Sequence, residues 1–109
     1  MTLFAFGINH KTAPVEIREK VAFAPEKLSE ALQQLSHTDD IHEAAIVSTC
    51  YRTELYCGID SDDSSAIPEW FSHYHHLASD EVAPYIYTHS DNDAVQHILR
   101  VASGLYSLV

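Results

Sequence analysis

Two residues with reactive side chains lie two positions apart near the middle of the chain. In the stretch IVSTCYRTELYCGI, residues 46–59, Cys50 follows one apolar run and Arg52 begins near the next. A cysteine attacks as its thiolate, which a nearby cation favours, and an arginine binds carboxylates through paired hydrogen bonds. The adjacent hydroxyl of Thr49 can donate to the same substrate. The pattern indicates a nucleophilic thiol beside an anion-binding group.

A plainer interpretation of Cys50 is that it ends a strand as a small buried residue. Free cysteine is among the most buried residue types, and on composition alone burial is the commoner role. Cys57 fits that role well, because it alternates onto one face of the second strand with Leu55 and Ile59. The two cysteines do not form a Cys-x-x-Cys pair, so we expect neither a disulfide framework nor a zinc site.

The histidine-rich stretch HYHH, with His73, His75 and His76, is a second candidate for chemistry. On a helix the neighbours His75 and His76 point about 100° apart, so only His73 and His76 share a face. Two ligands without a third make a weak metal site. We therefore interpret the three histidines as solvated residues at a helix end and predict no bound metal.

The hydrophobic pattern along the chain predicts the elements that would hold these residues. Apolar and β-branched runs predict strands at residues 3–8, 44–49, 53–59 and 85–88. Apolar residues three and four apart predict helices at residues 13–21, 24–35, 66–77 and 91–105, with a short helical turn from residue 79. The caps that we expect are Thr12, Ser64 or Ser65, and Ser90 or Asp91.

The last predicted helix carries His97. Its periodicity predicts an apolar face made of Val95, Ile98, Leu99, Ala102 and Leu105. His97 lies at the margin of that face, on the side of Val101 and Gly104. A histidine in such a position more often makes a structural hydrogen bond than it takes part in catalysis.

The order of elements predicts the α+β class and a ferredoxin-like βαββαβ sandwich with an extra helix. We expect an antiparallel four-stranded sheet with helices packed on one face. Residues 1–109 form a single domain. The sequence ends within an apolar helical pattern that lacks a cap, so we expect the domain to be part of a longer protein.

Composition restricts the functional class. Six Lys and Arg against sixteen Asp and Glu give a formal charge of −10, which argues against a broad basic surface for nucleic acid. No run approaches the roughly 20 apolar residues of a membrane helix, and the N-terminus lacks the basic region of a signal peptide. Glycine occurs only at 7, 58 and 104, so a Gly-x-Gly-x-x-Gly turn is absent and we assign no cofactor-binding residues. We predict a cytoplasmic protein.

Three blocks of sequence carry a resemblance to a known family. GINHKTAP (residues 7–14), STCYRTELY (48–56) and RVASGLYSLV (100–109) resemble, in order and separation, the N-terminal catalytic domain of glutamyl-tRNA reductase. The resemblance implies an oxidoreductase of tetrapyrrole (porphyrin, haem) biosynthesis by the C5 pathway. In that family a cysteine attacks glutamyl-tRNA to give a thioester, and NADPH reduces the thioester to glutamate 1-semialdehyde.

The resemblance also implies roles for individual residues. Cys50 matches the nucleophile, and His97 matches a histidine near the thiol that assists proton transfer. Thr49 and Arg52 match substrate-contacting positions, with Arg52 the natural partner of the glutamate side-chain carboxylate. Ser107 matches a further substrate-contacting position.

Other positions of the matched blocks are less closely defined. His10 and Lys11 are expected to have a supporting role at the mouth of the site. Two tyrosines depart from the family pattern, because Asn is expected at Tyr51, also a substrate-contacting position, and Asp at Tyr106. Tyr51 cannot offer the donor and acceptor pair of an amide, so it either changes substrate binding or turns outward.

The resemblance implies the following partners and cofactor. The substrate is glutamyl-tRNA(Glu), glutamate 1-semialdehyde aminomutase is a candidate partner, and NADPH is bound by a domain absent from this chain. The full-length protein is expected to be a homodimer and the fragment a monomer that lacks reductase activity. The alternative from another class is a non-enzymatic ferredoxin-like module that binds a ligand or partner and in which Cys50 is buried.

Overall fold

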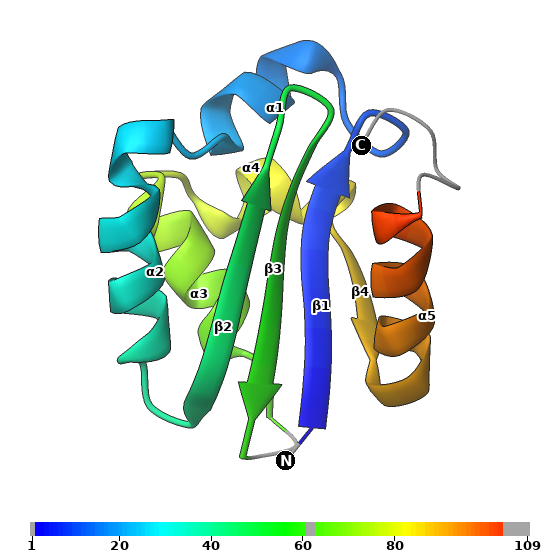
Figure 1. Ribbon diagram of the computed structural model, residues 1–109. Coiled ribbons are helices and arrows are strands. Elements are labelled where there is room, and N and C mark those ends of the chain that lie inside the picture. The colour runs from blue at the N-terminus through cyan, green and yellow to red at the C-terminus, as the bar shows by residue number, and fades with distance from the viewer. Residues whose placement is uncertain (1, 61–62, 104–109) are drawn as a thin grey trace.

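The computed structural model describes residues 2–60 and 63–103 and contains a four-stranded sheet (Figure 1). Its strands are β1 (Thr2–Asn9), β2 (Ile41–Ser48), β3 (Arg52–Ile59) and β4 (Tyr87–Ser90). They lie in the order β2-β3-β1-β4, and every neighbouring pair is antiparallel. The predicted α+β class, the ferredoxin-like strand order and the antiparallel sheet are therefore confirmed.

The helices connect the strands in the predicted order. They are α1 (Val15–Val21), α2 (Leu28–Ser36), α3 (Ala66–Tyr74), α4 (Ser79–Val82) and α5 (Asp91–Ala102), with short 3-10 turns η1 (Pro25–Lys27) and η2 (Ala83–Tyr85). Because η2 continues the turn of α4, the last strand begins two residues later than predicted. Thr12 is not a helix cap, since Pro14 precedes α1 and the Thr12 hydroxyl accepts a hydrogen bond from the Asn9 N–H.

One face of the sheet carries the apolar core. Alternate residues of β1 and β3 point into it, and helices α1 to α4 supply the opposite wall. The side chains at its centre are Phe4, Phe6, Ile8, Leu55, Cys57, Ile59, Ile67 and Phe71. The predicted burial of Cys57 is confirmed, and Ala31 and Leu35 of α2 are buried as their spacing predicted. Within the described part of the chain, no helix is long and apolar enough to cross a membrane.

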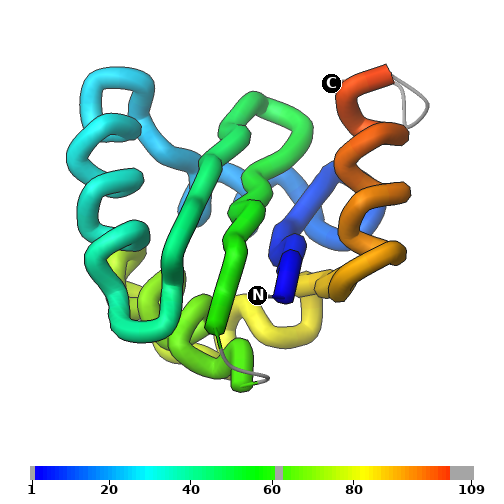
Figure 2. The backbone as a smooth tube through the Cα atoms, turned by 60° about the horizontal axis from the view of Figure 1, so that its bottom comes forward, coloured from blue at the N-terminus to red at the C-terminus, as the bar shows by residue number. Residues whose placement is uncertain are grey.

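Helix α5 packs on the other face of the sheet, against β1 and β4 (Figures 1 and 2). Glu54 points away from the core that holds its neighbour Leu55, and it bonds His97 of α5. The expectation that the helices pack on one face is therefore wrong for α5. Figure 2 shows α5 near the β1 side of the sheet, apart from α2.

The apolar face predicted for α5 is also wrong. Val95 and Leu99 are 44% and 62% exposed, whereas Ala94, His97 and Val101 are buried. The physical reason is that the sheet surface beneath α5 contains a buried carboxylate, so the helix turns its histidine inward to bond it. Leu105 lies outside the described residues.

Candidate functional site

Cys50 lies in the tight turn that joins β2 to β3. The Thr49 N–H donates to the Arg52 carbonyl at 2.8 Å, and the Thr49 hydroxyl accepts from the N–H groups of Tyr51 and Arg52 at 3.2 and 3.3 Å. From α1, Nη1 of Arg18 donates to the Cys50 carbonyl at 3.0 Å. The Cys50 side chain is exposed. The turn thus presents the thiol at the end of a hydrogen-bonded hairpin, and the interpretation of Cys50 as a buried residue is wrong.

Arg52 begins a buried polar cluster under α5. Both Arg52 and Glu54 are 1% exposed, and Nη1 of Arg52 lies 3.5 Å from Oε1 of Glu54. The same carboxylate accepts hydrogen bonds from the hydroxyls of Tyr56 and Tyr87 and bonds Nε2 of His97. Glu54 therefore joins Arg52 and His97, which are 45 positions apart in the sequence (97 minus 52).

The electrostatics of the cluster keep Glu54 ionised. Burial raises the pKa of Glu54, but hydrogen bonds from Tyr56, Tyr87 and His97 outweigh it, and the pKa is lowered. Burial and the Glu54 carboxylate raise the pKa values of Tyr56 and Tyr87, so both remain hydrogen-bond donors. An ionised Glu54 can only accept, which assigns a proton to Nε2 of His97. The position and tautomer of His97 thus follow from Glu54.

Gly7 allows this cluster to lie against β1. A Cβ at Gly7 would be 2.7 Å from Cγ of Glu54, 2.9 Å from the Thr53 carbonyl oxygen and 3.0 Å from the Tyr87 hydroxyl. Contacts this short make any side chain at this position costly, because the carbonyl oxygen belongs to the neighbouring strand and cannot easily move away. The close approach requires glycine.

Residues in and next to the turn at 49–51 line two different cavities. A smaller cavity of about 220 Å³ contains Arg52 and His97, and its other lining residues are Asn9, His10, Lys11, Thr12, Tyr87 and His89. A larger cavity of about 410 Å³ contains Thr49 and Cys50 together with residues of α1. The structure therefore brings Arg52 and His97 together, and Thr49 and Cys50 together, but places the two pairs in different cavities.

Cationic and aromatic groups surround the smaller cavity. His10 and Lys11 line it, as expected of residues at the mouth of the site. Burial, followed by the charges of Arg52, Lys11 and Arg18, lowers the pKa of His10. The ring of Tyr51 lies edge-to-face with His10, at 6.2 Å between centroids, and is 36% exposed, so Tyr51 is turned outward. Ser107 and Tyr106 lie outside the described residues.

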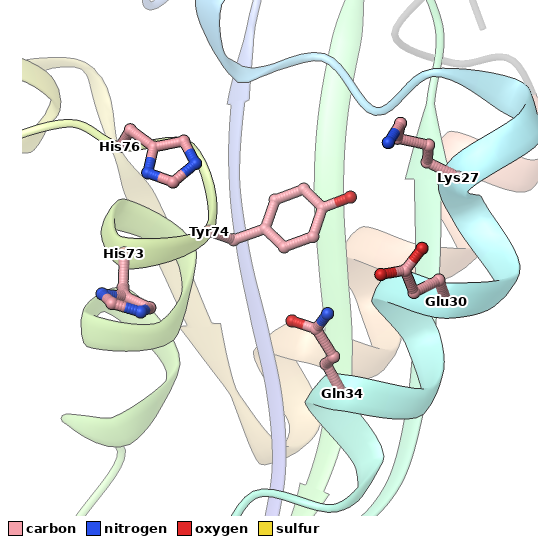
Figure 3. Close-up of a pocket in the computed structure, with 6 residues that line it drawn as sticks. All are labelled: Lys27, Glu30, Gln34, His73, Tyr74 and His76. Carbon is pink, nitrogen blue, oxygen red and sulfur yellow. The ribbon is translucent and has the colours of Figure 1, made fainter.

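The interpretation of the HYHH histidines as solvated residues is wrong at one of the three positions. His73 and His76 are exposed and face α2 with Tyr74 across a cavity of about 380 Å³ (Figure 3). His75, however, is half-buried and packs its ring on Phe23 and Phe71. Within residues 2–60 and 63–103, no three His, Cys, Asp or Glu side chains are grouped to hold a metal ion.

Sequence reasoning missed two residues of the site. Glu54 could have been found, because it alternates with Arg52 and Tyr56 on one face of a strand whose other face is apolar, and a charge there needs a buried partner. Arg18 gave no local signal, since its contact with Cys50 joins residues 32 positions apart. Only the fold brings α1 to the turn.

The fold and site together define a ferredoxin-like α+β domain that presents an exposed cysteine on a β-turn beside a buried arginine–glutamate–histidine cluster. The family model described as "Glutamyl-tRNAGlu reductase, N-terminal domain" matches residues 6–109. The chain belongs to this family. Its resemblance to the family over essentially the whole chain is confirmed.

Individual relatives agree with the family assignment. The chain is 56% identical over 109 residues to the glutamyl-tRNA reductase of Pseudoalteromonas translucida and 50% identical to that of Aromatoleum aromaticum, and it covers 26% of each. The solved glutamyl-tRNA reductase of Methanopyrus kandleri superimposes with a TM-score of 0.73 at 26% identity, over 97% of this chain and 23% of that one. The chain thus spans about a quarter of the length of the curated relatives it matches.

Proposed function

We propose that this domain takes the glutamyl group of glutamyl-tRNA(Glu) onto Cys50 as a thioester, within an oxidoreductase of tetrapyrrole biosynthesis. The observation that carries the proposal is the turn at residues 49–52. It holds an exposed thiol, and its last residue, Arg52, lines a cavity together with Lys11. An enzyme acting on an activated ester must mainly position a nucleophile and recognise the acyl group, and this turn does both.

The smaller cavity is suited to a dicarboxylic acyl group. Arg52 offers a planar guanidinium that matches a carboxylate, and Glu54 fixes its orientation from within the sheet. Lys11 extends the positive potential of the cavity, and His10, whose pKa is lowered, offers a neutral ring beside it. Because the chain carries a formal charge of −10, we expect it to receive the glutamyl end of the substrate and to leave most tRNA contacts to other parts of the protein.

Acyl transfer then requires few further groups. The Cys50 thiol gives its proton to water, and the thiolate attacks the ester carbonyl, so that a C–S bond forms and the C–O bond breaks. The ribose oxygen takes a proton back from water and leaves as a hydroxyl. Thr49, which lines the cavity of the thiol, offers a hydroxyl for a hydrogen bond to the substrate. His97 binds the glutamyl group in the smaller cavity. For His97 to exchange a proton with Cys50, the turn must move toward α5.

The reduction implied by the family name needs a hydride donor, for which the family uses NADPH. The residues of this chain do not fit a dinucleotide, because its three glycines are far apart and form no phosphate-binding turn. The step that we derive for this chain therefore ends at the thioester. By family resemblance we propose that the longer protein supplies the NADPH site, is a cytoplasmic homodimer and has glutamate 1-semialdehyde aminomutase as a partner.

Intact-mass spectrometry after mixing the chain with glutamyl-tRNA tests the proposal. We expect a glutamyl adduct on Cys50, release of free tRNA, and slow hydrolysis of the adduct by water. Cys50→Ser should abolish the adduct, whereas Cys57→Ala, a matched change at the buried cysteine, should keep it. Arg52→Lys should slow adduct formation by about tenfold or more, since an ammonium cannot make the bidentate contact. Absence of both adduct and released tRNA would falsify the proposal.

A further inference from the structure

Arg18 of α1 contacts the turn that carries Cys50, and the glutamyl recognition proposed above does not use it. Its Nη1 donates a hydrogen bond of 3.0 Å to the Cys50 carbonyl. Within residues 2–60 and 63–103, Arg18 forms no ion pair, and its buried Nε has no hydrogen-bond partner. The Cys50 carbonyl is therefore the one acceptor that this guanidinium has among the residues that the structure describes.

A closed turn at the end of β1 fixes where α1 begins. The side-chain oxygen of Asn9 accepts from the N–H groups of Lys11 and Thr12 at 2.9 and 3.1 Å, and the Thr12 hydroxyl accepts from the Asn9 N–H at 3.0 Å. Pro14 then precedes the helix, and its carbonyl accepts from the Arg18 N–H at 3.1 Å. Because these bonds satisfy the backbone of the turn from within, they define the position of α1 relative to β1.

A second link joins the segment after α1 to the residue before the turn. The Phe23 N–H donates to the Ser48 hydroxyl at 3.0 Å. Phe23 is 4% exposed and packs with the rings of Trp70 and Phe71 of α3, so this link is anchored in the apolar core. Figure 1 shows α1 beside the turn between β2 and β3. The α1 region therefore holds the turn at two points, Ser48 before it and Cys50 within it.

We infer that Arg18 is a positioning residue for Cys50. The hydrogen bonds between Thr49 and residues 51 and 52 fix the internal shape of the turn but not its direction relative to the sheet. The charge-assisted bond from Arg18 holds the peptide plane of Cys50, next to the bond that carries the thiol. Direction matters because an acyl-transfer nucleophile must meet the ester carbonyl at a defined distance and angle. The inference rests on the proposed function and adds the residue that orients the thiol.

Two reactions of Cys50 separate positioning from an effect of charge. If Arg18 acted by stabilising the thiolate, its loss would slow every reaction of Cys50 and move the pH dependence to higher pH. In Arg18→Ala we expect adduct formation at saturating glutamyl-tRNA to be about tenfold slower, with the half-saturating concentration within about twofold. Alkylation by iodoacetamide, which needs no fixed orientation, should keep its pH inflection and stay within about twofold of the unaltered chain.

Lys20→Ala is the matched control. Lys20 and Arg18 both lie in the last turn of α1, so each change removes one positive charge from the same end of the same helix. Lys20 is exposed and does not line the cavity that contains Cys50. Lys20→Ala should therefore leave the rates of both reactions unchanged. Slowing of both reactions by the same factor in Arg18→Ala, or an unchanged rate of adduct formation, overturns the inference.

A second readout does not depend on the reaction with tRNA. The N–H of Tyr51 belongs to the same peptide plane as the Cys50 carbonyl, so its ¹⁵N order parameter reports whether that plane is held. We expect about 0.85 in the unaltered chain and in Lys20→Ala, and a fall toward about 0.6 in Arg18→Ala. An unchanged order parameter in Arg18→Ala overturns the inference. If the unaltered chain forms no glutamyl adduct but the order parameter falls as expected, the proposed function is refuted and the role of Arg18 in holding the Cys50 peptide stands.

Discussion

Neighbouring residues of β3 face two interiors of opposite chemistry. Leu55 is 0% exposed and points into an apolar core, whereas Glu54, 1% exposed, points into a cluster of charges and hydroxyls under α5. Side chains on both faces of β3 are almost completely buried. Apolar packing stabilises one face, whereas hydrogen bonds to a single carboxylate stabilise the other. The comparison teaches that burial alone does not identify the core of this domain.

The same contrast separates the two cysteines. Burial on the apolar side raises the pKa of Cys57 to about 12, so its thiol stays protonated at neutral pH. Cys50 lies exposed at the end of the hairpin, where the polar cluster begins. One strand thus carries an apolar side that packs in the core and a polar side that forms the buried cluster under α5.

The largest expected effect comes from making the polar side apolar. Glu54→Leu removes the carboxylate that Arg52, Tyr56, Tyr87 and His97 share, and it should lower the free energy of unfolding by about 3–5 kcal/mol. The measurement is urea unfolding of the chain followed by circular dichroism.

Leu55→Ala is the matched variant on the apolar side of the strand. It removes buried apolar atoms and should cost about 2–5 kcal/mol through the cavity that it leaves. Glu54→Leu should in addition prevent the glutamyl adduct on Cys50, because Arg52 and His97 lose their common anchor, whereas any folded Leu55→Ala should still form it. If the Glu54→Leu chain is stable and still forms the glutamyl adduct, then the polar side of β3 is not needed for the reaction of Cys50.

A smaller effect is expected from Gly7→Ala, which tests how tightly the polar side is packed. The added Cβ would overlap Glu54 and the Thr53 carbonyl, and we expect a loss of about 1–3 kcal/mol on urea unfolding. Ala45→Val adds methyl groups at an exposed position of β2 and should change stability by less than about 0.5 kcal/mol. Equal free energies of unfolding for the two variants would contradict this, because they would mean that Glu54 and the β3 backbone can shift beneath α5 at little cost.

The apolar side could be predicted from sequence and the polar side only in part. Alternation in β3 and the spacing of Ala31 and Leu35 in α2 are local patterns, and the residues that they indicate are buried. In α5, two overlapping stripes were compatible with the same periodicity, and the choice depended on a carboxylate 43 positions away. Hydrophobic periodicity carries no information on which buried polar groups will meet, so it assigned Val95 and Leu99 to the wrong side.

His75 is a titratable residue on the apolar side of the sheet, where its ring packs among aromatic side chains. It therefore tests whether the apolar side also makes stability depend on pH. Burial, followed by the charge of His76, lowers the pKa of His75 to about 4, against about 6.5 in an unfolded chain. Unfolding therefore takes up a proton between these pH values. The stabilisation is fully present above pH 6.5 and is lost as the pH falls toward 4.

Replacing His75 with Phe should remove this pH dependence. We expect the free energy of unfolding of the unaltered chain to fall by about 1–2 kcal/mol from pH 7 to pH 4.5, a range reduced for the partial exposure of the ring, and that of His75→Phe to fall by less. Urea unfolding at several pH values gives both profiles. His73→Gln, at an exposed position of the same helix, should keep the original slope. Parallel profiles for His75→Phe and the unaltered chain would show that acid sensitivity comes from the polar side, where a protonated Glu54 would lose its hydrogen bonds.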